Sequence, residues 1–171
     1  MKDFLSAQTL AKAVVDGLEA RGLSVALAES CTGGLLAKTL TNVPGASNVF
    51  ECGVVAYSED IKQRVLGVRA ETLRDHSVVS PEVALEMARG VRALAESDFG
   101  IGITGVAGPG PDGDHPEGEI YIALSDDTKE TVLVLTDRTE QARTLHRARA
   151  AYAALRMLTQ RLSELPPRQD G

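Results

Sequence analysis

A short apolar segment that runs into a polar, glycine-rich turn and then into a helical pattern constrains this chain most. The segment spans residues 23–28 and has the length and composition of a buried strand. The turn reads Ala-Glu-Ser-Cys-Thr-Gly-Gly at residues 28–34, and apolar residues from Leu35 to Leu40 predict a helix over about 33–41. This order is typical of an open α/β sheet, in which ligand-binding groups lie where strands end.

Two interpretations of the turn are open from its residues alone. The glycine pair allows a ligand to approach closely, and unpaired N–H groups of the following helix would favour an anion or a developing oxyanion near Ser30. An ordinary helix cap accounts for the same residues, with Ser30 or Thr32 accepting a hydrogen bond from a free N–H group.

Helical and strand patterns alternate along most of the chain. Strands are predicted over residues 49–57, 99–104, 119–125 and 130–135, and helices over 5–21, 58–65, from Ser80 onward, and about 139–163. The alternation predicts one domain over residues 1–165 that folds as an α/β protein, a three-layer α/β/α sandwich with a mixed, mostly parallel sheet, followed by a tail at 166–171.

A second glycine-rich turn, at residues 105–110, follows the predicted strand 99–104. If the strands 23–28 and 99–104 are parallel neighbours, both turns lie on one edge of the sheet and share a cleft.

Apolar spacing also predicts which helix faces are buried. In the helix 58–65, Ile61 and Val65 are expected to point inward. The stripes predicted for the two longer helices are Val83, Met87, Val91 and Leu94, and Leu145, Ala148, Tyr152, Leu155 and Leu162.

Composition excludes several classes of function. Eighteen basic against twenty-four acidic residues give a net charge of −6, which makes nucleic acid a poor candidate for the main ligand. No apolar run is long enough to span a bilayer, and the amino terminus lacks the apolar core of a signal peptide. Two cysteines and three scattered histidines suggest neither a disulfide framework nor a metal site. The sequence therefore predicts a cytoplasmic protein without a metal, a cofactor or a membrane partner.

The segment 28–34 is very similar to the signature of the CinA C-terminal domain family. The likeness continues in order and at the family's spacing over nearly the whole chain, through residues 44–47, 53–58, Lys62, 66–68, 79–80, 104–109 and Gly118. Members of this family that act alone resemble nicotinamide mononucleotide deamidase. The resemblance implies a serine amidohydrolase with a Ser/Lys arrangement, no metal, a nucleotide substrate and a homo-oligomer, with a dimer favoured.

The resemblance also implies roles for individual residues. Ser30 would be the nucleophile and Lys62 its base, with Tyr57 and Ser47 as polar partners in the same site. A family pattern that is commonly Gly-Asp-Arg reads Thr-Asp-Arg here, at 136–138, and the distance to the last helix is about one turn longer than usual. Which arginine meets the substrate is therefore open. The implied substrate-binding residues are Glu29, Cys31, Thr32, Gly33, Gly34, Thr104, Gly105, Ala107, Gly108, Arg138, Arg143 and Arg147.

The residue types limit which side chains could act as nucleophile and as base. A serine hydroxyl needs a base, and no histidine lies near any motif, which disfavours a Ser-His-Asp triad. Lys62 can serve if its pKa falls from about 10.4 towards neutrality, although a solvated lysine on a short helix is the more common case. Cys31 is a rival nucleophile, but adjacent residues normally point in different directions.

Two function classes follow from these residues. In the first, Ser30 attacks the carboxamide of nicotinamide mononucleotide, ammonia leaves, and water hydrolyses the nicotinoyl ester. In the second, the chain is a nucleotide-binding or regulatory module that kept the pocket and lost turnover, which the altered arginine spacing favours.

Overall fold

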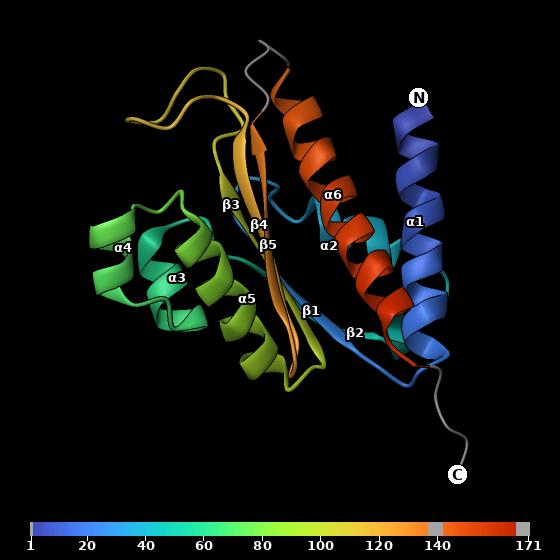
Figure 1. Cartoon of the computed structure of the whole chain (residues 1–171). Helices are drawn as coiled ribbons and strands as arrows, with labels where there is room; N and C mark the ends of the chain where they lie inside the picture. Colours follow the sequence, from blue (N-terminus) through green and yellow to red (C-terminus); the bar gives the residue numbers. More distant parts are fainter. Residues whose placement is uncertain (1, 137–141, 167–171) are drawn as a thin grey trace.

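A five-stranded sheet with the strand order β2-β1-β3-β4-β5 forms the middle of the molecule (Figure 1). The computed structural model describes residues 2–136 and 142–166, with side chains from residue 7 onward. The strands are β1 (Val25–Glu29), β2 (Phe50–Val55), β3 (Phe99–Gly105), β4 (Glu119–Ser125) and β5 (Glu130–Thr136). β1 pairs in parallel with β2 and β3, whereas β4 is antiparallel to both β3 and β5. Four strands therefore point in one direction and β4 in the other, which confirms the predicted mixed, mostly parallel sheet.

Helices cover both faces of the sheet, as Figure 1 shows. One face carries α1 (Lys2–Glu19), α2 (Leu35–Thr41) and α6 (Arg143–Glu164). The other carries α3 (Glu59–Leu66), α4 (Ala70–His76) and α5 (Pro81–Ala95), and a short 3-10 helix, η1 (Ala46–Asn48), precedes β2. The three-layer α/β/α sandwich is thus confirmed, but α4 was not predicted, since its seven residues bury only Thr72 and Leu73.

The alternation of glycine and isoleucine in β3 explains how two different layers pack on one strand. Ile101 and Ile103 belong to the core shared with α1, α2 and α6. On the opposite face, a Cβ at Gly100 or Gly102 would collide with backbone carbonyls of α5. The two glycines therefore let α5 lie directly against the sheet.

The predicted helix faces are confirmed in part: Val83, Met87, Val91, Leu155 and Leu162 are buried, and four other predicted positions are exposed. Val65 and Leu94 are 39% and 53% exposed, and Leu145 and Ala148 also point outward. The inner face of α3 is formed by Lys62 and Leu66, with the predicted Ile61 half-buried beside them. On α6 it is formed by His146, Ala150, Ala151, Ala154, Leu155, Leu158 and Leu162. A buried lysine and a buried histidine occupy positions that an apolar stripe cannot reveal.

The last helix begins later than predicted. α6 starts at Arg143 after Ala142, which has an extended backbone, and Arg138 and the predicted helical residues 139–141 lie outside the described residues. Of the predicted tail, Pro166 follows α6 and the remainder lies outside the described residues.

The predicted juxtaposition of the two glycine-rich turns is confirmed. β1 and β3 are parallel neighbours, and the backbone N–H of Ser30 donates to the carbonyl of Ile103 at 2.9 Å. Both turns therefore leave the sheet at the same edge, where β2 also ends.

Candidate active site

A cavity of about 260 Å³ opens at the edge of the sheet where β1, β2 and β3 end. It is lined by residues at or after the ends of these strands, by residues 78–79 before α5, and by the first turn of α6. The side chains that line it include Ser30, Cys31, Tyr57, Lys62, Thr104 and Arg143. The structure thus brings together most of the catalytic residues that the resemblance implies, and their catalytic roles stay a prediction.

Lys62 reaches the cavity from α3. Ser58 caps this helix by accepting a hydrogen bond from the backbone N–H of Ile61, at 3.3 Å. One residue later, the Lys62 side chain passes inward and is only 1% exposed. Its Nζ donates to Ser30 Oγ at 3.1 Å and to the carbonyls of Ala56 and Tyr57 at 2.8 and 3.4 Å.

These contacts suit a lysine that exchanges a proton with a serine. Burial lowers the pKa of Lys62 from its ordinary value of 10.5, while the nearby Cys31 and Glu59 raise it less. A neutral amine can donate its two N–H groups to the carbonyls of Ala56 and Tyr57 and offer its lone pair to the Ser30 hydroxyl. The arrangement therefore provides a nucleophile and a base within hydrogen-bond reach.

Cys31 also lines the cavity, but its burial disfavours the thiolate, which is the nucleophilic form of the side chain. Burial raises the pKa of its thiol to about 11, with Arg143 and Lys62 opposing this shift weakly. The thiol is protonated at neutral pH and is a poor nucleophile in that form. The local chemistry therefore favours Ser30 over Cys31.

Glu29 occupies the helix terminus that the sequence suggested for a substrate anion. Its carboxylate, 2% exposed, accepts hydrogen bonds from the backbone N–H groups of Leu36 and Ala37 at 3.1 and 2.8 Å. The expectation that free N–H groups of α2 face an anion beside Ser30 is therefore wrong, because Glu29 satisfies two of them.

The two described arginines of the expected set have different surroundings. Arg147 donates from Nε and Nη2 to the carbonyl of Thr32, at 3.2 and 2.7 Å, and a Cβ at Gly33 would lie 3.1 Å from its guanidinium. Arg147 thus supports the Ser30 turn from outside, and Gly33 and Gly34 have the positive φ values of 59° and 87° that the turn requires.

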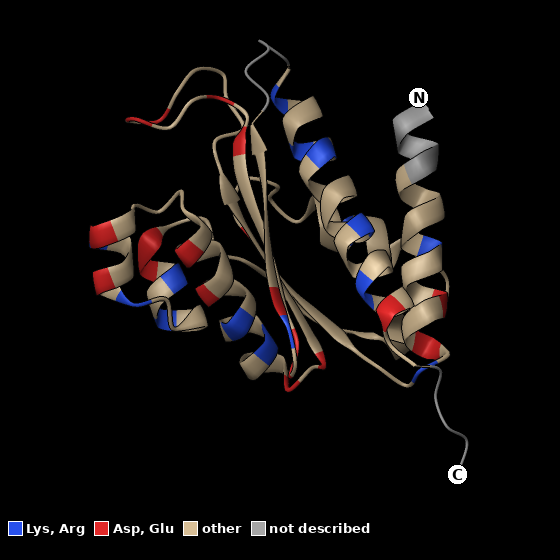
Figure 2. Cartoon of the chain, in the orientation of Figure 1, with Lys and Arg blue, Asp and Glu red and all other residues tan. Residues whose placement is uncertain are grey.

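Arg143 lies at the mouth of the cavity. Its Nη1 donates to the carbonyl of Gly108 at 2.5 Å, and its Nη2 donates to the hydroxyl of Tyr57 at 3.0 Å. Tyr57 is 62% exposed, so this pair faces solvent at the entrance. Figure 2 shows that basic residues recur along α6 from this end of the helix.

The opposite wall of the cavity comes from the end of β3 and the turn after it. The Thr104 hydroxyl donates to the carbonyl of Val78 at 2.8 Å, and Gly105, Ala107 and Gly108 also line the cavity. Val78 and Val79 line it too, although no site role was predicted for them from the sequence. The only signal for this segment was that Val79 falls within a stretch of family likeness.

Ser47 is not brought to the site within this chain. It is exposed in η1, just before β2, and the first residue of β2 pairs with the first residue of β1. Ser30 follows the last residue of β1, so the two serines lie near opposite ends of that strand. Within one chain, Ser47 is therefore not a polar partner of Ser30, and this expectation is corrected.

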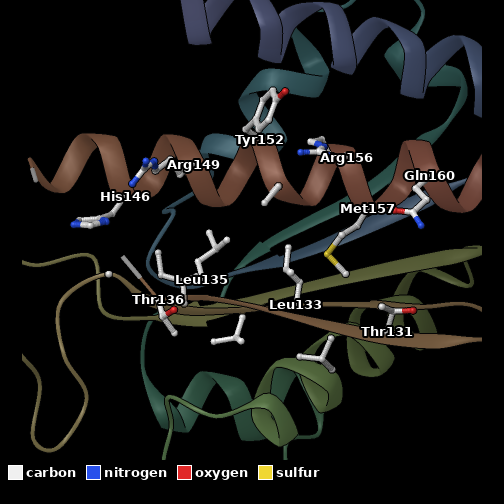
Figure 3. A pocket seen from close by; sticks show the side chains of 15 residues that line it. Thr131, Leu133, Leu135, Thr136, His146, Arg149, Tyr152, Arg156, Met157 and Gln160 are labelled. Carbon is white, nitrogen blue, oxygen red and sulfur yellow. The ribbon is translucent and has the colours of Figure 1, made fainter. Parts of the chain in front are cut away.

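A larger cavity of about 740 Å³ lies between α6 and β5, away from Ser30 (Figure 3). Side chains of His146, Arg149, Tyr152 and Met157 line it on the helix side, and Leu133 and Leu135 line it on the strand side. Among the described residues that form its walls there is no catalytic residue expected from the sequence, so the smaller cavity is the candidate site.

The described residues contain neither a candidate metal site nor a helix that could span a membrane. No group of three or more His, Cys, Asp or Glu residues that could hold a metal ion occurs within residues 2–136 and 142–166. In the same described part of the chain, no helix is both long enough and apolar enough to cross a membrane.

Comparison with known proteins gives a consistent result. The profile of the CinA C-terminal domain matches residues 7–162. A "Putative competence-damage inducible protein" of Caldanaerobacter subterraneus subsp. tengcongensis is 50% identical over 134 residues, which are 77% of this chain and 32% of that protein. A "CinA-like protein" of Acidobacterium capsulatum is 43% identical over 156 residues, 91% of this chain and 37% of that protein. The chain therefore spans about a third of the length of these curated relatives.

Solved structures show the same similarity over almost whole chains. The competence damage-inducible protein A (ComA) from Klebsiella pneumoniae superposes with a TM-score of 0.88 at 34% identity, covering 94% of this chain and 99% of that one. The competence/damage inducible protein CihA from Agrobacterium tumefaciens gives a TM-score of 0.87 at 34% identity, covering 92% and 96%.

Proposed function

The chain belongs to the CinA C-terminal domain family, and on that basis we propose that it is a serine-type amidohydrolase that converts nicotinamide mononucleotide to nicotinic acid mononucleotide and ammonia. The observation that carries the proposal is the buried contact of 3.1 Å between Lys62 Nζ and Ser30 Oγ. The names of the similar proteins state no reaction, so the substrate rests on the family resemblance and on the chemistry of the cavity.

The first half of the proposed reaction forms an ester on Ser30. Neutral Lys62 takes the proton of the Ser30 hydroxyl as Oγ attacks the carboxamide carbon of the substrate. The protonated Lys62 then gives a proton to the leaving nitrogen, the C–N bond breaks, and ammonia departs. The nicotinoyl group is left as an ester on Ser30 Oγ.

The second half regenerates the enzyme. Lys62, neutral again, takes a proton from a water molecule that attacks the ester carbonyl, and it returns the proton to Ser30 as the C–O bond breaks. The product is nicotinic acid mononucleotide, and the overall change is amide plus water to carboxylic acid plus ammonia. No metal or cofactor is needed to balance these steps.

The size of the cavity and the position of Arg143 support one orientation for the bound substrate. Its volume of about 260 Å³ lies just below the usual range of about 300–1,000 Å³ for small-molecule sites, so we place the nicotinamide end inside and the phosphate at the mouth. Arg143, at the mouth, is the proposed phosphate partner because a guanidinium binds phosphate oxygens in pairs. Arg147 does not line the cavity and donates to the carbonyl of Thr32, so it is assigned to the turn.

An ammonia-release assay with nicotinamide mononucleotide tests the proposal. Wild-type protein should release ammonia and the Lys62→Met variant should not, whereas Lys38→Met, which changes an exposed lysine of α2, should behave as wild type. Binding of the mononucleotide without any ammonia release would instead identify a nucleotide-binding or regulatory module. A cytoplasmic homo-oligomer, with a dimer favoured, is part of the same proposal, and sedimentation would measure the oligomeric state.

A further inference from the structure

The segment between β3 and β4, residues 106–118, forms one wall of the cavity and is shaped by the carboxylate of Glu117. Its base is closed by backbone hydrogen bonds of 2.8 Å from Val106 to Glu119 and from Gly118 to Val106. Beyond this base, Glu117 Oε2 accepts the backbone N–H of Gly110 at 2.7 Å. The Glu117 side chain is 17% exposed, so this bond is made largely out of water.

Gly108 packs directly on the same side chain. Gly108 has a φ of 82°, and a Cβ placed there would lie 2.7 Å from Cγ of Glu117 and closer still to its carboxyl group. Glu117 therefore contacts both ends of the turn 108–110, one through a hydrogen bond and the other through close packing.

Glu117 also contacts α6. Its Oε1 lies 3.3 Å from Nε2 of His146, which is 1% exposed, although the two atoms lack the alignment of a hydrogen bond. His146 is three residues after Arg143, about one helical turn along α6, and Figure 3 shows it on that helix. The carboxylate thus lies between the turn 108–110 and the part of α6 that carries Arg143.

The carbonyl of Gly108 is the link to the cavity mouth, because it accepts the 2.5 Å hydrogen bond from Arg143. We propose that Glu117 is a positioning residue that fixes the Gly108 carbonyl and, through it, holds Arg143 at the mouth of the cavity. That Arg143 then meets a substrate phosphate rests on the function proposed above. Ser30 and Lys62 lie on other segments, so Glu117 should affect binding far more than the chemical step.

Residues 112–115 of the same segment are held by other contacts, so they provide an internal control. His115 Nδ1 lies 3.2 Å from Glu119 Oε1, and His115 Nε2 lies 3.0 Å from Ser77 Oγ. Asp112 and His115 also exchange two backbone hydrogen bonds of 3.0 Å. Loss of Glu117 should therefore loosen the turn 108–110 and leave residues 112–115 in place.

The first measurement is hydrogen exchange of individual backbone amides without any substrate. In Glu117→Ala, exchange of the Gly110 amide should be at least tenfold faster than in wild type, and exchange at His115 should change less than twofold. Glu117→Gln keeps an acceptor for Gly110 and should stay close to wild type at this amide. Asp114→Asn removes an exposed charge from the same segment and should change neither rate.

The second measurement is the affinity for nicotinamide mononucleotide, by calorimetry in a Ser30→Ala background and as KM in the active protein. Glu117→Ala should weaken binding and raise KM by roughly ten- to hundredfold, the usual effect of losing a hydrogen bond to a charged group, with kcat changed less than about threefold. The expected result is that Asp114→Asn leaves both constants unchanged.

The two measurements separate the two proposals. If the Gly110 amide exchanges equally in wild type and Glu117→Ala, the positioning role is overturned, whatever the substrate. If wild type binds no mononucleotide, the proposed function falls, while a Glu117-dependent exchange rate at Gly110 would still support the positioning role. A fall in kcat with unchanged KM would also overturn the inference, because it would place Glu117 in the chemical step.

Discussion

Replacing Lys62 with methionine should remove turnover and leave the fold intact. The two side chains have similar length, but only lysine can take a proton from Ser30, whose Oγ lies 3.1 Å from Nζ. Loss of a general base typically costs about 10²–10⁴-fold, and we expect a fall of this size in kcat. Lys62→Arg should be nearly as inactive, because a guanidinium keeps its proton.

The stability of Lys62→Met can be estimated from the contacts of Nζ. The variant removes a donor from three acceptors, at about 1 kcal/mol each, which is about 3 kcal/mol. Against this, it removes the cost of burying an ammonium group, which is several kcal/mol in real proteins. The free energy of unfolding at pH 7 should therefore equal or exceed that of wild type.

The pH dependence of this difference has a definite sign. Burial lowers the pKa of Lys62 in the folded protein, so between that lowered pKa and 10.5 the unfolded chain binds more protons than the folded one. Wild-type stability gains a contribution that rises with pH across this window, and Lys62→Met lacks it. The advantage of the variant should shrink as pH rises towards 10.5. The activity of wild type should rise with pH along a single basic limb, because only neutral Lys62 is a base.

Urea unfolding followed by circular dichroism at several pH values, with ammonia release measured in parallel, provides the assay. Lys38→Met is the matched control, since it removes an exposed lysine and should shift neither property. Two results would refute the reasoning: a stability difference between Lys62→Met and wild type that does not vary with pH, or a Lys62→Arg variant that keeps most of its activity.

Four further predictions concern residues near Lys62 and the absence of a metal from the proposed mechanism. Ser30→Ala should lose several orders of magnitude in turnover. Cys31→Ala should keep most of its turnover, since burial holds the thiol protonated. An inactive Cys31→Ala variant would identify Cys31, and not Ser30, as the nucleophile. Arg143→Ala should raise KM for the mononucleotide by roughly ten- to hundredfold. Arg147→Ala, which loses only its bonds to the Ser30 turn, should raise KM less. Steady-state kinetics with both variants would show the opposite order if Arg147 were the phosphate partner. Glu29→Ala should lower the free energy of unfolding by about 1–3 kcal/mol, measured by urea denaturation, because two N–H groups of α2 lose a buried acceptor; an unchanged value would mean that water replaces the carboxylate. Activity should survive exhaustive chelation, and loss of activity with chelator followed by recovery with a divalent ion would contradict the metal-free mechanism.

Local patterns in the sequence predict the class of fold and the edge of the sheet at which the candidate site lies. Helical and strand periods are local properties, and their alternation predicts an α/β sandwich with few alternatives. The glycine-rich turns after β1 and β3 were expected to share a cleft because parallel neighbours end at the same edge, and the Ser30–Ile103 hydrogen bond confirms it. Polar residues at strand ends are visible in a sequence because they interrupt apolar runs.

The contacts of each polar side chain at that edge form only when distant segments of the chain come together. An apolar stripe cannot predict that α3 buries Lys62, since that burial depends on acceptors from Ser30 and Ala56, which directly follow β1 and β2. The same holds for Glu29, which meets N–H groups seven and eight residues ahead only because α2 folds back over the end of β1. Partners that are distant along the chain fix the burial and direction of a charged group, whereas the period of a helix or strand depends only on its neighbours.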